Sequence, residues 1–450
     1  MSSAKKYSVA ESNAFINECE IGPWRSGKLN GLRFAVSEMI DVAERPTGCG
    51  NPSWSAARKA AACNALCVDM LLSAGAQCVG RTRTDEFTFS LVGESSFFST
   101  PLNPRAPERV PGGSSSGAAS AVACGIVDFA ISLDSGAATQ VTSSNCGLYG
   151  WRPVSGTIPT AGIQPVSPSF DTVGIVAASP AVLKLVAEVF ANLGGAEELV
   201  RSGQLEIYKL SDAWRKADTQ VLEALQGGRE KLEELLGISI SAISLEDIGT
   251  IGSGGSRIPP RKPALPGRDP ALSGGNPSLP AGNVSLPGGE ASLSGNSAVA
   301  DLHEWYQTYL KLFCMESWNS FGTWIESSKP ELGQEAKANI HRSRLSDRSD
   351  SLMYFQRREN FARATAAFLG ANRMICIPSC SELAPPKGFI AGVNDPGDYY
   401  PSTLSLASLA SVGRLAQLSF PAGEVEGVPV GMSLLAANEA ALLALLGLLG

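Results

Sequence analysis

The turn at residues 112–117 reads Gly-Gly-Ser-Ser-Ser-Gly and holds the residue types best suited to chemistry in this chain. Glycines let the backbone bring its N–H groups close to a ligand, and serines supply hydroxyl groups. A small-residue helix is expected directly afterwards, so the same letters also fit a helix N-cap. Phosphate binding of the P-loop kind is not favoured, because no Gly-Lys-Ser/Thr follows. By itself, the turn predicts either a ligand site or a helix cap.

Histidine and cysteine offer weaker alternatives. Both histidines lie in helical segments far from a Gly/Ser turn, so a Ser-His-Asp arrangement is not expected. Cys63 and Cys67 are one helical turn apart, while Cys376 and Cys380 lie on either side of a proline at a strand end. Four thiolates could bind zinc, but free cysteine is usually a buried apolar residue. We therefore predict neither a metal site nor a cofactor.

Helices and strands are expected on both sides of the turn, and these elements must position it. Residues 55–74 carry apolar side chains at helical spacing, and a short strand is expected at 77–79. The order repeats in a helix at 118–124 and a strand at 126–133. Alternating helices and strands predict an α/β fold with a mixed, mostly parallel sheet surrounded by helices.

Residues 252–297 interrupt these patterns with a composition dominated by Gly, Pro, Ser and Asn. A segment this long and this poor in apolar residues predicts a disordered insertion rather than a domain. Further elements are expected beyond it: helices at 302–318 and 354–369, and strands at 374–377 and 415–420. We therefore predict one domain in two parts, residues 1–251 and 298–450.

Composition limits the classes of partner and the cellular compartment that we expect. Among 450 residues, 36 Lys and Arg stand against 43 Asp and Glu, a net charge of −7, so nucleic acid is not an expected partner. Ten scattered cysteines are typical of a reducing compartment. Residues 1–20 are polar and include acidic residues, unlike a signal or transit peptide. The apolar tail 440–450 is about half the ~20 residues that span a bilayer. We expect a cytoplasmic protein without a membrane span.

Two stretches together resemble the amidase-signature family. Residues 111–125 read PGGSSSGAASAVACG, and residues 134–153 read DSGAATQVTSSNCGLYGWRP. Family members typically read Asp-Thr-Gly-Gly-Ser-(Ile/Val)-Arg-x-Pro in the second stretch, ending in Cys-Gly-x-x-Gly-(Leu/Phe)-(Lys/Arg)-Pro. Residues 29–36 resemble the opening strand of the family, and 428–433 resemble its closing strand. The resemblance covers nearly the whole chain apart from the insertion.

Three further segments resemble one plant branch of this family. These are Gly-Asn-Pro-Ser-Trp at 50–54, Asn-Pro-Arg at 103–105 and Ser-Phe-Asp-Thr-Val-Gly at 169–174. The branch contains indole-3-acetamide hydrolases and the amidase-like domain of a chloroplast outer-envelope docking protein. The resemblance implies that an association with chloroplasts is compatible with this chain.

The family resemblance implies a catalytic triad of a Ser nucleophile, a second Ser held by a cis peptide bond, and a Lys that acts as base. The cis-Ser position is Ser114, which is retained. The nucleophile position holds Ala138, and the Lys position holds Ser37. An alanine side chain has no lone pair to attack a carbonyl, and a serine cannot replace a lysine base at neutral pH. Both requirements for covalent acyl transfer are therefore lost.

The residues around position 138 depart from the family pattern as well. Ala137 replaces a glycine, Gln140 replaces an arginine and Thr142 replaces a proline. Backbone N–H groups of Ser135, Gly136, Ala137 and Ala138 are nevertheless expected to face a cavity as oxyanion or ligand donors, because such donors need no particular side chain.

The sequence thus predicts a catalytically inactive amidase-like protein with a binding, scaffolding or regulatory role. Its partner would be a small amide or carboxylate ligand, or another protein. The alternative is an active amidohydrolase that cleaves a small aryl-acyl amide such as indole-3-acetamide, with Ser135 or Thr139 as a displaced nucleophile. A third hypothesis, a decaying paralogue kept only as a folded subunit, predicts no ligand.

Overall fold

A mixed eleven-stranded sheet runs through the described part of the chain. The computed structural model describes residues 7–192, 194, 196–201, 203–252, 301–392 and 399–449. The order across the sheet is β1-β3-β2-β4-β6-β5-β10-β11-β9-β7-β8. The strands are β1 (Phe15–Ile21), β2 (Arg33–Ser37), β3 (Gln77–Thr82), β4 (Phe129–Asp134), β5 (Tyr149–Arg152), β6 (Thr172–Ala177), β7 (Glu206–Leu210), β8 (Ser241–Ile243), β9 (Arg373–Pro378), β10 (Ala416–Val425) and β11 (Val428–Ala436).

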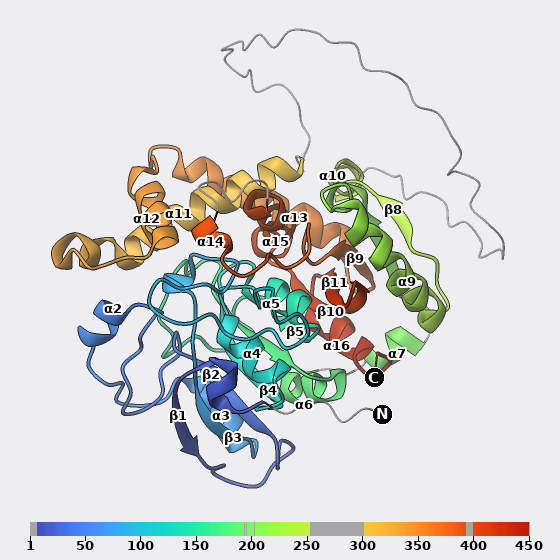
Figure 1. Cartoon of the computed structure of the whole chain (residues 1–450). Coiled ribbons are helices and arrows are strands. Elements are labelled where there is room, and N and C mark those ends of the chain that lie inside the picture. The colour runs from blue at the N-terminus through green and yellow to red at the C-terminus, as the bar shows by residue number, and fades with distance from the viewer. Residues whose placement is uncertain are drawn as a thin grey trace.

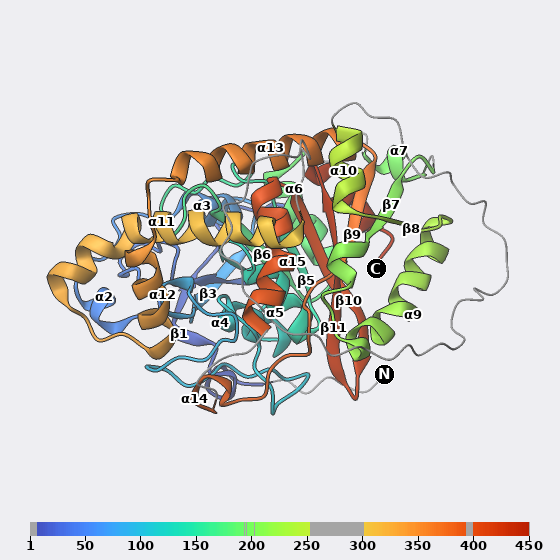
Figure 2. The same ribbon diagram turned by 90° about the horizontal axis from the view of Figure 1, so that it is seen from above.

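Helices cover both faces of this sheet (Figures 1 and 2). They are α1 (Val9–Ser12), α2 (Pro52–Ala56), α3 (Leu66–Ser73), α4 (Ser116–Ala123), α5 (Ala138–Cys146), α6 (Pro180–Phe190), α7 (Ala196–Arg201), α8 (Ser211–Trp214), α9 (Thr219–Leu236), α10 (Leu245–Gly252), α11 (Leu302–Ser328), α12 (Gln334–Leu345), α13 (Ser351–Leu369), α14 (Phe389–Gly392), α15 (Tyr399–Gly413) and α16 (Glu439–Leu445). A 3₁₀ turn, η1, spans Glu86–Thr88.

Side chains along each strand point alternately to the two faces of the sheet, and this divides the core into two layers. Phe34 and Val36 of β2 pack into the cluster that includes α3, α6, α9 and α16. Ala35, between them, packs on the opposite face with α4. Farther along that opposite face, strand residues such as Ile375 pack with α11, α13 and α15. Successive strand side chains point to opposite faces, so a central strand buried on both sides is apolar throughout.

The expected mixed α/β architecture is confirmed, but parallel pairing is less extensive than predicted. Among the described strands, parallel pairs occur only in two groups, β3-β2-β4 and β8-β7-β9. The other six pairings are antiparallel. One reason lies in the connections: β10 turns back into β11 through Glu426 and Gly427, both at positive φ, and a hairpin can only join antiparallel strands.

Most expected elements form close to their predicted positions, with one clear exception. The single helix predicted at 55–74 is wrong, because the chain forms α2 and α3 with a loop between them. Ala61 pairs with the loop before α2, donating its N–H to the Arg45 carbonyl and accepting from Glu44. Hydrogen bonds to a distant segment replace those a continuous helix would need. The predicted insertion at 252–297 lies, apart from Gly252 at the end of α10, outside the described residues.

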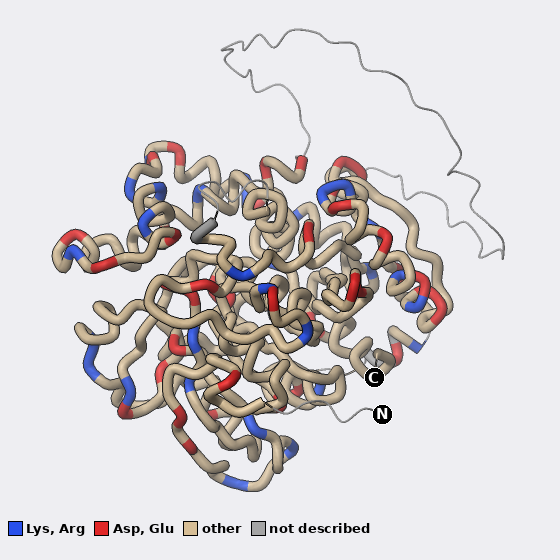
Figure 3. The backbone as a smooth tube through the Cα atoms, viewed as in Figure 1, with Lys and Arg blue, Asp and Glu red and all other residues tan. Residues whose placement is uncertain are grey.

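Charged residues of both signs are interspersed along the described chain (Figure 3). None of the described helices is long and apolar enough to cross a membrane.

Candidate functional site

The Gly/Ser turn lies at the start of α4 and is held by the loop between β3 and η1. The peptide bond between Gly113 and Ser114 is cis. The Ser114 carbonyl accepts hydrogen bonds from the backbone N–H of Asp85 (3.0 Å) and the hydroxyl of Thr84 (2.8 Å). Gly112 has a φ of +85°, a conformation that glycine adopts without strain. These contacts hold the Ser114 backbone while its side chain lines a cavity.

The second sequence stretch forms the turn between β4 and α5, and Asp134 organises it. The carboxylate of Asp134 accepts hydrogen bonds from the N–H groups of Gly136 and Thr139, both at 2.8 Å. It also forms a fully buried ion pair with Arg152, at 3.3 Å. On the other side of the turn, Tyr309 of α11 donates to the Ser135 carbonyl at 3.2 Å. The turn backbone is therefore held by side chains from β4 and α11, and Arg152 of β5 fixes Asp134.

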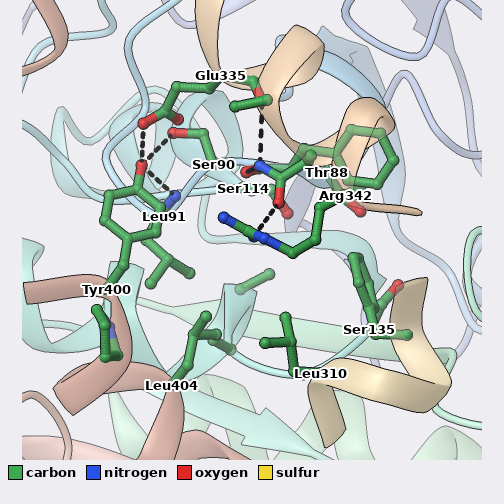
Figure 4. A pocket seen from close by; sticks show the side chains of 18 of the residues that line it. Thr88, Ser90, Leu91, Ser114, Ser135, Leu310, Glu335, Arg342, Tyr400 and Leu404 are labelled. Carbon is green, nitrogen blue, oxygen red and sulfur yellow. Dashed lines mark hydrogen bonds between the residues drawn. The ribbon is translucent and has the colours of Figure 1, made fainter. Parts of the chain in front are cut away.

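A cavity of about 330 Å³ joins the two sequence stretches (Figure 4). Of the predicted site residues, it brings together Ser114, Ser135, Gly136, Ala137 and Ala138. Its remaining wall is mainly aromatic and aliphatic, with side chains from η1, α11, α12, α14 and α15. These residues include Phe89, Tyr306, Leu310, Phe313, Phe389 and Leu404. A small apolar chamber with a few polar groups is the usual form of a small-molecule site.

Not all of the predicted oxyanion donors are free to donate a hydrogen bond to a ligand. The Gly136 N–H already donates to Asp134, so this part of the prediction needs correction. The N–H groups of Ser135, Ala137 and Ala138 make no hydrogen bond to another described residue. These three N–H groups remain as candidates to bind an oxygen atom of a ligand in the cavity.

Ser37 does not line the cavity. It ends β2, is only 1% exposed, and its hydroxyl oxygen accepts a long 3.4 Å contact from the Met39 N–H. The lysine position implied by the resemblance is therefore filled by a short buried side chain beside Thr82 of β3.

Two buried carboxyl groups near these turns were not anticipated from the sequence. Burial raises the pKa of Asp85 to about 8, although hydrogen bonds from the Ser116 hydroxyl and the Gly93 N–H oppose the shift. Burial likewise raises the pKa of Glu38, the neighbour of Ser37, to about 7, and Arg81 partly offsets the effect. Neither carboxyl group lines the cavity. The sequence signal for them is weak: Glu38 directly follows β2, and Asp85 lies three residues after the end of β3.

Sequence reasoning also missed several polar residues of the cavity wall. The Tyr400 hydroxyl of α15 donates a 2.5 Å hydrogen bond to Oε1 of Glu335, at the start of α12. The same hydroxyl lies 3.2 Å from the Ser90 hydroxyl and accepts from the Leu91 N–H at 3.3 Å (Figure 4). Arg342, two turns after Glu335 on α12, lines the same cavity. Glu335, Arg342 and Tyr400 lie more than 180 positions after the recognised motifs, and no motif pointed to them.

The two candidate substitute nucleophiles occupy different environments. The Ser135 hydroxyl donates a 2.6 Å hydrogen bond to Asp171, and Ser135 lines the cavity. Thr139 does not line it. Its hydroxyl oxygen lies against Gly174 of β6, so close that a side chain there would collide with it. The Thr139 hydroxyl therefore faces the interior of the sheet rather than a ligand.

Comparison with known proteins identifies the family. Residues 13–195 match the family model described as Amidase. Over 432 residues the chain is 32% identical to Amidase 1 of Arabidopsis thaliana, and the match covers 94% of each protein. The chain belongs to the amidase family.

Two further matches extend this amidase assignment. The chain is 28% identical over 409 residues to Translocon at the outer membrane of chloroplasts 64 of Pisum sativum, covering 91% of this chain and 63% of that protein. The solved structure of Kluyveromyces lactis allophanate hydrolase has a TM-score of 0.73 at 20% identity, covering 98% of this chain and 67% of that one. The expected resemblance to plant amidases and outer-envelope proteins is confirmed, and the solved structure shares the amidase fold.

Proposed function

We propose that this amidase-family chain binds a small ligand in the cavity without cleaving an amide bond. The observation that carries the proposal is the position of Ala138. Its methyl group stands at the first turn of α5, in the same cavity wall as Ser114 and beside available backbone N–H groups. A carbonyl compound could be held there, but the methyl group has no electron pair with which to form a covalent intermediate.

The missing base supports the same proposal. Ser37 is buried outside the cavity wall, and a hydroxyl group does not accept a proton at neutral pH as a desolvated lysine can. In a comparable nucleophile and base pair, loss of either member lowers the rate by about 10⁶, while some 10³ to 10⁴ over water survives from oxyanion binding. Here both positions are changed.

One observation favours the alternative, an amidohydrolase acting on a small aryl-acyl amide such as indole-3-acetamide. Ser135 lines the cavity, and its hydrogen bond to Asp171 resembles a nucleophile beside a base. Burial raises the pKa of Asp171, but its carboxylate also accepts N–H groups from Val166 and Ser167, which stabilise the charged form and weaken it as a base.

The two functions are separated by a serine-reactive fluorophosphonate and by hydrolysis of indole-3-acetamide, followed as ammonia release. We expect no labelling and no hydrolysis above buffer for the unaltered chain. Labelling that disappears in Ser135→Ala but persists in Ser114→Ala would establish the displaced nucleophile and overturn our proposal. Arabidopsis Amidase 1 serves as a family control for both assays.

A scaffolding or regulatory role follows from the same proposal if a protein partner recognises the folded, ligand-bound chain. We propose this role because the chain is similar to the pea protein. That protein extends beyond the region that this chain matches. A cytoplasmic location, with or without chloroplast association, remains a prediction.

A further inference from the structure

Arg342 is the cationic residue of the cavity wall, and it has no acidic partner among the described residues. Its guanidinium donates to Oδ1 of Asn339 at 3.0 Å, and no described carboxylate lies within ion-pair distance. The Asn339 amide nitrogen is itself fixed by the carbonyls of Phe89 (3.0 Å) and Glu335 (3.1 Å). Asn339 therefore orients one edge of the guanidinium and leaves its other N–H donors for a ligand. In Figure 4 this side chain points into the cavity.

The acidic residue of the wall does not neutralise this cation. Glu335 is the acidic group among the described lining residues. Burial raises its pKa, and its Oε1 atom accepts the hydrogen bond from Tyr400. The carboxyl group therefore accepts from Tyr400 and makes no ion pair with Arg342. Arg342 supplies the cationic group among the described lining residues.

Arg342 also lies where the cavity meets a second one. Leu310, Ala338 and Arg342 line both the 330 Å³ cavity and an adjoining cavity of about 570 Å³, which reaches Leu345 and Tyr354. A ligand whose apolar part fills the inner chamber would therefore place a charged group near the shared boundary. Aromatic side chains such as Phe89 and Phe313 provide flat apolar contacts for a ring in that chamber.

We propose that the cavity selects small aryl-substituted carboxylates over the corresponding amides, with Arg342 as the anion-binding residue. This inference rests on the proposed ligand-binding function. A planar guanidinium can make two parallel, charge-assisted hydrogen bonds to a carboxylate, whereas an amide presents one neutral oxygen and adds N–H donors that repel it. The preferred ligand would then be the acid that amide hydrolysis yields, and the protein would act as a receptor for it.

The test measures dissociation constants of indole-3-acetate and indole-3-acetamide by isothermal titration calorimetry. For the unaltered protein we expect the acid to bind about tenfold or more tightly than the amide. Arg342→Gln should abolish the preference, mainly by weakening acid binding. Arg344→Gln is the matched control, because Arg344 lies on the same helix but faces Glu326 at 3.7 Å outside the cavity. This control should keep the preference.

The measured affinities test the role of Arg342 separately from ligand binding itself. Equal affinities in the unaltered protein, or a preference that survives Arg342→Gln, overturn the role of Arg342 but leave ligand binding intact. Absence of binding by both compounds overturns both proposals. Chromatography of the recovered amide shows whether it was cleaved, and cleavage contradicts only the proposed lack of hydrolysis. Circular dichroism melting of each variant establishes that the compared proteins are folded.

Discussion

Ala138 and Ser114 face the same cavity from the starts of two different helices, α5 and α4. Position 138, where the family resemblance predicts a nucleophile, therefore lines the same cavity as the retained Ser114.

The first prediction restores the lost groups together. The double variant Ser37→Lys with Ala138→Ser should gain fluorophosphonate labelling and weak hydrolysis of indole-3-acetamide. Each single variant should gain little, because nucleophile and base act as a unit and their effects are not additive. Ser37→Lys combined with Ala137→Ser is the control, since a one-residue shift turns the hydroxyl in another direction. A folded double variant without labelling or turnover would show that the cavity itself has been remodelled, and would favour a protein-interaction role.

The second prediction concerns Gln140, which replaces the family arginine. Its amide oxygen accepts from Gln417 of β10 at 2.6 Å, and its amide nitrogen donates to the Ser379 carbonyl at 2.5 Å. Gln140→Arg should lower the free energy of unfolding by at least about 1–3 kcal/mol, because arginine cannot accept the Gln417 hydrogen bond and brings a charge to a buried site. Urea denaturation measures the loss. Gln226→Arg, on the exposed face of α9, should be close to neutral, and an equal loss there would refute this explanation.

The third prediction tests the buried pair that supports the 135–138 turn. Asp134 is 0% exposed and Arg152 is 2% exposed. Arg152→Met should cost about 3–5 kcal/mol of unfolding free energy, because it leaves a buried carboxylate without its counter-ion. Arg105→Met removes a surface ion pair with Glu424 and should cost about 1 kcal/mol or less. Similar losses in the two variants, measured by chemical denaturation, would contradict the assigned importance of the buried pair.

The fourth prediction is that the protonation of Asp85 makes the free energy of unfolding depend on pH. The pKa of Asp85 is about 8 in the folded protein, far above about 3.9 for an exposed aspartate. The folded chain then keeps a proton that the unfolded chain releases. The stability linked to this group is complete below about pH 4 and is lost as the pH rises through about 8.

Asp85→Asn removes this titration. Between pH 5 and 7, its unfolding free energy should fall less steeply than that of the unaltered chain, by up to about 1.4 kcal/mol per pH unit. Denaturation series at several pH values give both slopes. Glu230→Gln, on the exposed surface of α9, should retain the original slope. Parallel pH profiles for Asp85→Asn and the unaltered chain would show that Asp85 does not titrate in this range.

The sequence alone determined the family, the mixed α/β class and the residues at the three implied catalytic positions. This was possible because residues 111–125 and 134–153 are local stretches, in which glycines, small residues and turn residues are dictated by nearby backbone geometry. The elements around them were also predictable where the apolar pattern was regular, as in β9 and α13, or where small residues followed a Gly/Ser turn, as in α4.

Tertiary structure alone decided which side chains share the cavity. Glu335, Arg342 and Tyr400 reach it from α12 and α15, and nothing in their local sequence distinguishes a cavity wall from an ordinary amphipathic helix. The direction of the Thr139 hydroxyl and the commitment of the Gly136 N–H to Asp134 likewise depend on packing against distant strands and side chains. Local sequence fixes which groups are present, whereas long-range packing fixes where they point and what remains free to bind a ligand.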